Sequence, residues 1–218
     1  MRTRERLLDA AERLWGDRGV EAVSLREIRI AAGQRNSSAL QFHFGDRSGL
    51  LLALSQRHVP RIAALQQEQY AALVAAGRQD EVAALIEVLV GPSADYLQLG
   101  PSERAWIKIL AQQATRPETA LRDMVDHAPA VALHVGTTIH QRLSLSMDGD
   151  IVVERLISVG AACNHLCADR ARYEDAPEAA GLRPSLPFAR WRANLVDMAV
   201  GALLAPTSRP TGSSADPG

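Results

Sequence analysis

Apolar residues recur every three or four positions along most of the chain, which is the spacing of helices with one buried face. Residues 2–18 show this pattern first, with Leu7, Leu14 and Trp15 on one side. It continues over residues 61–76, 80–99, 101–115, 117–146, 150–172 and 187–205. No stretch sustains the period-two alternation of half-buried strands. The sequence therefore predicts an all-α protein of about nine helices.

Prolines and glycines predict where these helices end or bend. The fourth helix is expected to end or kink at Pro60, because an internal proline removes a backbone hydrogen bond and crowds the preceding turn. An interruption is expected near Gly91 and Pro92, and a kink at Pro129. From about residue 206 the chain is small, polar and proline-rich, so we expect a disordered tail.

Residues 24–44 predict two short helices joined by a turn. Ser24 and Glu27 have the spacing of a capping box at the start of the first helix. Gly33 suits the left-handed backbone that often ends a helix. Asn36 is a residue type that caps the helix after it.

The second of these helices is expected to bury Ala39, Leu40 and Phe44. Its other side chains would form a polar face that suits the donors and acceptors of a DNA major groove. This face consists of Arg35, Ser37, Ser38, Gln41 and His43. An ordinary solvated helical hairpin is the alternative, because the sequence signal of a helix-turn-helix is loose.

The flanking residues complete a motif set that points to one family. It comprises L-x-x-A-A-x-x-L-W at 7–15, Gly19, Ser24, Ile28, Ala31-Ala32-Gly33, His43-Phe44, Arg47 and Leu50-Leu51. With these residues, positions 2–54 resemble the N-terminal domain of the TetR family of one-component transcriptional regulators. The resemblance implies an all-α homodimer with an N-terminal DNA-binding domain and a larger effector-binding domain. It also implies repression that a small molecule relieves.

The sequence departs from the family pattern at three places. The interval from Gly33 to Phe44 is one residue longer than usual, which lengthens the turn over residues 34–36. Arg29 stands where a small alanine is common, so its guanidinium must leave the helix packing or find a partner. Phe42 lacks the hydroxyl with which a tyrosine in relatives often contacts phosphate. These differences concern individual DNA contacts rather than the fold.

We therefore expect a helix-turn-helix domain over residues 1–46, a ligand-binding and dimerisation domain over 47–205, and a tail over 206–218. A fourth helix starting at Asp46 or Arg47 would join the first two and transmit effector binding between them. The expected DNA contacts are Arg2, Arg4, Ser24, Arg35, Asn36, Ser37, Ser38, Gln41, His43 and Arg47. The arginines are expected at phosphates and Gln41 at a base edge.

Composition and charge fit this interpretation without adding to it much. The chain has 218 residues, 47% of them hydrophobic, which is enough to bury a core. Residues 1–58 carry a net charge of +3 and residues 59–218 carry −4, which gives the overall −1. No apolar run reaches the roughly 20 residues that span a bilayer, and the N-terminus lacks a signal-peptide pattern. We expect a cytoplasmic protein without a membrane partner.

The last two predicted helices have the 3.5-residue spacing of paired helices, as in a dimer interface. The interface candidates are Val152, Leu156, Val159, Cys163, Leu166, Phe188, Trp191, Leu195, Met198 and Ala202. The alternative is a stripe buried within one chain. A dimer would place two DNA-reading helices about 34 Å apart, so the operator is expected to be an imperfect palindrome.

An effector site is less visible in the sequence. Its candidates are Tyr96, Trp106, His127, His134, His140 and Asn164, each of which could equally be an ordinary core or surface residue. Cys163 and Cys167 share a helix face, but His165 points elsewhere, so we expect no metal and no cofactor. No catalytic motif is present, so no enzyme is expected. A helical protein-binding adaptor remains the alternative to a DNA-binding regulator.

Overall fold

A computed structural model describes residues 3–113, 128–176 and 186–207. These residues form nine α-helices and one short 3-10 helix and contain no strand, which confirms the all-α fold class. The helices are α1 (Thr3–Arg18), α2 (Leu25–Ala31), α3 (Ala39–Phe44), α4 (Arg47–Ala75), α5 (Val82–Tyr96), η1 (Leu97–Leu99), α6 (Pro101–Gln113), α8 (Ala130–Leu143), α9 (Gly149–Asp175) and α10 (Phe188–Leu204).

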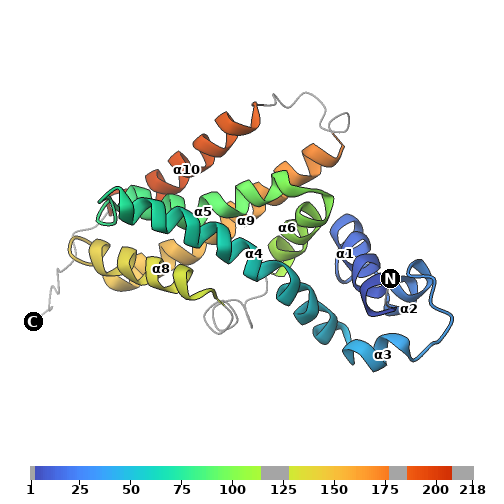
Figure 1. Cartoon of the computed structure of the whole chain (residues 1–218). Coiled ribbons are helices and arrows are strands. Elements are labelled where there is room, and N and C mark those ends of the chain that lie inside the picture. Colours follow the sequence, from blue (N-terminus) through green and yellow to red (C-terminus); the bar gives the residue numbers. More distant parts are fainter. Residues whose placement is uncertain (1–2, 114–127, 177–185, 208–218) are drawn as a thin grey trace, which may run out of the picture.

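Helices α1–α3 form a small head at one end of the molecule, and the remaining helices form a larger body (Figure 1). Helix α4 runs from the head into the body, where it packs on α5 and α8. Helix α1 packs closely against α6, so the head contacts the body there in addition to its connection through α4. In the body, α9 packs on α6 and on α10, and α10 also packs on α5.

One continuous hydrophobic core joins the head to the body. It extends from Leu7 and Trp15 in α1, both fully buried, through Leu54 in α4 to Ile107 in α6 and Val152 in α9. Head and body therefore share buried surface. The division at residue 46 stays a prediction.

In the described residues the predicted helix end at Pro60, the interruption near Gly91 and Pro92 and the kink at Pro129 are wrong, whereas a kink at Pro60 stays a prediction. Helix α4 continues through Pro60 to Ala75, and α5 continues through Gly91 and Pro92. Packing on either side keeps these helices intact: His58 and Ile62, which flank Pro60, are both buried. Pro129 is the N-terminal cap of α8 and does not kink a longer helix.

The beginning of the predicted helix 117–146 and most of the predicted tail, from residue 208 on, lie outside the described residues.

By length and mean hydropathy alone, two stretches qualify as candidate membrane spans, residues 82–99 and 149–175. The first is 56% buried within the protein, as expected for a core helix. Only 22% of the second is buried, although it is equally apolar. Helix α9 therefore presents apolar surface that the rest of the described chain does not cover.

Candidate nucleic-acid interface

The first helix of the predicted helix-turn-helix is capped as the sequence indicated. The Ser24 hydroxyl accepts a hydrogen bond from the Glu27 backbone N–H at 3.2 Å, and the Glu27 carboxylate accepts one from the Ser24 N–H at 2.9 Å. This bond from the Ser24 backbone, with those from its hydroxyl and from Arg18, lowers the pKa of Glu27 to about 2. The Ser24 hydroxyl also donates to Glu27, so it is engaged within the chain.

Arg29 fixes the lengthened turn between α2 and α3. Its guanidinium donates to the carbonyl oxygens of Gln34 at 2.7 Å and Arg35 at 3.1 Å. Gly33 begins this turn with φ +67°, the left-handed conformation predicted for it. The unusual arginine and the extra turn residue thus compensate each other, because the guanidinium satisfies carbonyls that the longer turn leaves open.

Asn36 stabilises the end of the turn, not the helix itself. Its side-chain oxygen accepts hydrogen bonds from the backbone N–H of Ser38 at 3.0 Å and from the Ser38 hydroxyl at 2.8 Å. Helix α3 begins later than predicted, at Ala39, with Ser38 as its N-terminal cap residue. The prediction that Asn36 caps this helix is therefore wrong by two positions.

Helix α3 has the predicted two faces. Ala39 and Leu40 are buried, and Phe44 packs partly buried against the core. Gln41 and Phe42 are exposed, and 84% of the Phe42 side chain is accessible. The other predicted polar residues, Arg35, Ser37 and Ser38, are exposed, whereas His43 is half-buried.

The predicted phosphate-binding arginines have different surroundings. Arg35 is exposed. Arg4 is half-buried, with its guanidinium 5.2 Å from the centre of the Phe44 ring and 3.3 Å from Glu5. Arg2 lies outside the described residues.

Arg47 is tied into the head. Its guanidinium donates to the backbone carbonyls of Val20 and Val23 and lies 3.8 Å from the Glu21 carboxylate. It therefore anchors the loop before α2 to the start of α4. Its role at a phosphate stays a prediction.

A buried polar cluster between head and body was missed in the sequence. Glu12 in α1 is 3% exposed and His58 in α4 is fully buried. The His58 Nε2 atom lies 3.2 Å from the Glu12 carboxylate, and its Nδ1 atom lies 2.8 Å from the Tyr96 hydroxyl. A neutral imidazole protonated on Nε2 satisfies both bonds, with the tyrosine as donor to Nδ1.

Two further side chains complete this cluster, which we call the Glu12 hub: Glu12, Arg57, His58, Tyr96 and Ser102. The Ser102 hydroxyl and the Arg57 guanidinium both donate to the Glu12 carboxylate, the latter at 2.9 Å. Burial raises the pKa of Glu12, but the hydrogen bonds from His58, Ser102 and Arg57 outweigh it and lower the pKa below 4.5. Burial raises the pKa of Tyr96 to about 12, so its hydroxyl stays a donor.

One signal could have indicated the hub from sequence. Glu12 stands on the apolar face of the first helix, one turn after Leu8 and next to Ala11, both buried. A charged residue on a core-facing stripe requires a buried partner. The partners could not be named, because they lie 46 and 90 residues away in the chain.

The predicted effector residues have different surroundings in the described part of the chain. Tyr96 belongs to the hub, and Trp106 stacks on His58 with ring centres 5.2 Å apart. His134 is exposed and its ring nitrogen lies 2.8 Å from the Tyr70 hydroxyl. His140 and Asn164 are half-buried, and His127 lies outside the described residues.

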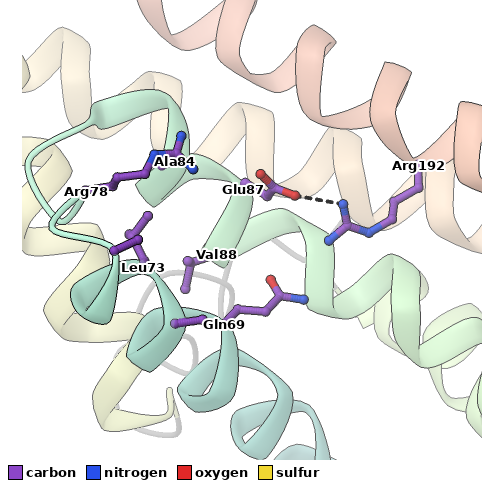
Figure 2. A pocket seen from close by; sticks show the side chains of 9 residues that line it. Gln69, Leu73, Arg78, Ala84, Glu87, Val88 and Arg192 are labelled. Atoms are coloured by element: carbon purple, nitrogen blue, oxygen red, sulfur yellow. Dashed lines mark hydrogen bonds and ion pairs between the residues drawn. The ribbon is translucent and has the colours of Figure 1, made fainter.

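A cavity of about 310 Å³ lies between α4, α5 and α10 (Figure 2). None of the predicted effector residues lines it; the lining residues are Gln69, Ala72, Leu73, Ala76, Arg78, Ala84, Glu87, Val88 and Arg192. Arg192 bonds to Glu87 at 2.8 Å and to Asp95 at 2.6 Å.

The predicted interface residues divide between the core and the surface of the chain. Val152, Cys163 and Leu195 are buried within the chain, so the intramolecular stripe is the correct interpretation for these three. The apolar periodicity could not distinguish a core stripe from an interface stripe, because both have the same spacing. Phe188, Trp191, Leu156, Val159 and Leu166 are partly buried, whereas Met198 and Ala202 are exposed.

Both cysteines are free and buried, and burial raises the pKa of the Cys163 thiol to about 11. The described residues contain no group of three or more His, Cys, Asp or Glu side chains that could hold a metal ion.

Comparison with known proteins adds a family match and more distant likenesses. Residues 7–54 match the sequence profile of "Bacterial regulatory proteins, tetR family". The chain is 32% identical over 66 residues to the HTH-type transcriptional repressor AcnR of Corynebacterium glutamicum, which covers 30% of the chain and 35% of that repressor. The chain thus matches about a third of the length of this curated relative.

Two solved structures are also similar. A gamma-butyrolactone receptor (ArpA-like protein) is 24% identical, with TM-score 0.46, over 90% of this chain and 97% of the receptor. Salmonella enterica GusR is 16% identical, with TM-score 0.47, over 92% of this chain and 95% of GusR.

Proposed function

We propose that the chain is a DNA-binding transcriptional regulator of the tetR family, whose sequence profile matches its residues 7–54. In this proposal it is a cytoplasmic repressor, not an enzyme, and a small molecule releases it from its operator. The observation that carries the proposal is the exposed face of α3, with Ser38 and Gln41, which follows the turn that Arg29 bonds. Residues 1–46 would bind DNA, and residues 47–205 would bind the effector and dimerise.

The exposed face of α3 has the chemistry of a major-groove contact. The Gln41 amide can donate to and accept from an adenine edge at the same time. Arg35, which is exposed beside the helix, is the proposed phosphate contact. Base reading thus falls to Gln41 and positioning to Arg35.

Gln41→Ala is expected to change which DNA sequence the protein prefers. Loss of a bidentate base contact removes about 1–3 kcal/mol of discrimination at one position of each half-site. Arg35→Ala, the control, is expected to weaken binding to all sequences and to reduce the salt dependence by about one ion per half-site. The measurement is selection of bound fragments from a random DNA library, followed by gel shifts at several salt concentrations.

Two results would count against this proposal. Equal losses on every sequence for both variants would refute the base contact of Gln41. Absence of salt-sensitive binding by the unmodified protein to any selected fragment would refute the regulator and favour the protein-binding adaptor.

We further propose that a second copy of the chain covers the exposed faces of α9 and α10. Three large apolar side chains on these two packed helices are exposed: Met198 is 52% exposed, Leu204 is 44% exposed and Val153 is 39% exposed. A Cβ added at Gly160 or Gly201 would meet nothing within 4 Å, so another helix has room to approach there. Such a dimer would present two α3 helices to successive major grooves.

Met198→Glu is expected to convert the protein to monomers and to weaken operator binding by at least about tenfold, since a charge in an apolar interface loses its hydration. Sedimentation equilibrium and gel shifts measure the two effects. The matched control is Leu145→Glu, because Leu145 is 88% exposed in the segment after α8. A monomeric unmodified protein, or equal effects of both variants, would contradict the proposed interface.

For the effector we propose the cavity between α4, α5 and α10 as the binding site. Its volume of about 310 Å³ is at the small end of ligand sites, and it combines apolar Leu73 and Val88 with polar Gln69 and Arg192. Figure 2 shows Gln69 from α4 and Arg192 from α10 on the same side of the cavity. A ligand that binds one arrangement of α4 and α5 more tightly than another would shift α4. Through the Glu12 hub it would also shift α1.

A further inference from the structure

Phe42 is the most exposed aromatic side chain among the described residues, at 84% accessibility. Its neighbour Phe44 packs against the core, and the core residues Ala39 and Leu40 occupy the inner face of the same helix. Nothing in the described chain covers the Phe42 ring except the edge of His43, with ring centres 5.1 Å apart. A large apolar side chain exposed to water is costly, which indicates that the ring meets a partner when the head is bound.

The ring lies on the outward face of α3. Ser38 and Gln41, four and one positions earlier, are exposed on the same side. If Gln41 enters the major groove, Phe42 enters with it. The occupant of this position is therefore a group on the edge of a base pair, not a second protein.

A phenyl ring has no hydrogen-bond donor or acceptor, so it cannot pair with a phosphate or with the polar edge of a base. The apolar group that base pairs present in the major groove is the C5-methyl of thymine. The neighbouring Gln41 amide matches adenine, which brings thymine, its pairing partner, close to the ring. Both residues thus favour the same class of base pair.

We propose that Phe42 determines specificity by contacting the C5-methyl group of a thymine in each half-site. This inference rests on the proposed DNA-binding function and extends it from the polar contacts to an apolar one. The same methyl occurs on 5-methylcytosine, so the chemistry recognised is a methyl at C5 of a pyrimidine, and thymine is the source we expect.

The test uses the full-length protein and a duplex that it selects from a random library. Each thymine is replaced singly by deoxyuridine, which removes only the methyl group. At one position of the half-site, the replacement is expected to lower the affinity of the protein for the duplex roughly fourfold per half-site. This is the factor that corresponds to the burial of one carbon atom. Phe42→Ala is expected to bind the original duplex weaker by a similar factor and to be insensitive to deoxyuridine at that position.

Two controls separate the contact from general effects. Leu99→Ala removes another exposed apolar side chain, 54% accessible in η1, and is expected to keep the full response to deoxyuridine. At the sensitive position, a 5-methylcytosine–guanine pair is expected to bind more tightly than the unmethylated pair. Equal binding of these two pairs would overturn the methyl contact.

The outcomes distinguish this inference from the function on which it rests. If the unmodified protein binds no selected duplex, the proposed function fails and the inference fails with it. If it binds specifically but no deoxyuridine replacement weakens it, or Phe42→Ala keeps the sensitivity, only the methyl contact fails. Thermal unfolding of Phe42→Ala should match the unmodified protein, because the ring makes so few contacts in the folded chain.

Discussion

Glu12→Ala is expected to destabilise the folded protein by about 3–5 kcal/mol, the cost of removing one partner from a buried charged cluster. The substitution leaves His58, which is fully buried, without the acceptor of its Nε2 proton. It also removes the carboxylate that Arg57 and Ser102 bond. Chemical denaturation measures the loss. Because Glu12 joins α1 to α4 and α6, operator binding is expected to fall as well.

Glu5→Ala is the matched control for Glu12→Ala. Glu5 bonds the same Arg57 at 2.8 Å, but its side chain is 44% exposed, so its loss is expected to cost less than about 1 kcal/mol. If Glu12→Ala lowers the free energy of unfolding no more than Glu5→Ala does, the Glu12 hub stabilises the protein no more than an exposed ion pair.

The pH dependence gives a second check on Glu12. Its pKa in the folded state is lowered below the ordinary 4.5, so the carboxylate stabilises the fold above that pH. This contribution is lost as pH falls through the folded-state pKa. The difference in stability between the unmodified protein and Glu12→Ala is therefore expected to be largest near neutral pH and to shrink in acid.

Gly49→Ala is expected to weaken operator binding on the order of 100-fold, since lost base contacts cost about 1–3 kcal/mol in each half-site. Gly49 lies in the first turn of α4, and a Cβ there would overlap the backbone carbonyl oxygen of Phe44. The Phe44 backbone cannot change rotamer to relieve the overlap, as a flexible side chain can. The junction between α3 and α4 must therefore shift, and α3 shifts with it. Gel shifts measure the loss of binding, and denaturation should show about 1–3 kcal/mol of destabilisation.

Gly136→Ala provides the comparison for Gly49→Ala. Gly136 is also inside a helix, α8, but a Cβ there would meet nothing within 4 Å. In open space alanine is the better helix former by roughly 1 kcal/mol, so Gly136→Ala should stabilise the protein and leave DNA binding intact. The clash with Phe44 is disproved if Gly49→Ala behaves like Gly136→Ala.

The local features of the head could be predicted because each depends on residues close in sequence. The Ser24–Glu27 capping box, the left-handed Gly33 and the inward Ala39 and Leu40 all follow from short spacings. The need of Arg29 for a partner also followed from the cost of an unpaired buried charge. Its partners, two turn carbonyls, became apparent only in the structure.

Features set by distant contacts could not be predicted in the same way. Pro60 was expected to end or kink α4, but packing at His58 and Ile62 carries the helix through it. The stripe that contains Val152 and Leu195 was assigned to an interface, yet these side chains fill the chain's own core. Local helix propensity differs by less than about 1 kcal/mol between ordinary residues and by about 3 kcal/mol for an internal proline, and the packing of several buried side chains exceeds both.

The sequence by itself determined the helical class, the caps and turn of the helix-turn-helix, and the two faces of α3, because hydrophobic period and capping chemistry act within a few residues. The tertiary structure alone decided which polar groups meet across helices. The Glu12 hub is the clearest case, since its hydrogen bonds join residues 46 and 90 positions apart. Such contacts depend on how the helices pack around one core, and no local pattern encodes that.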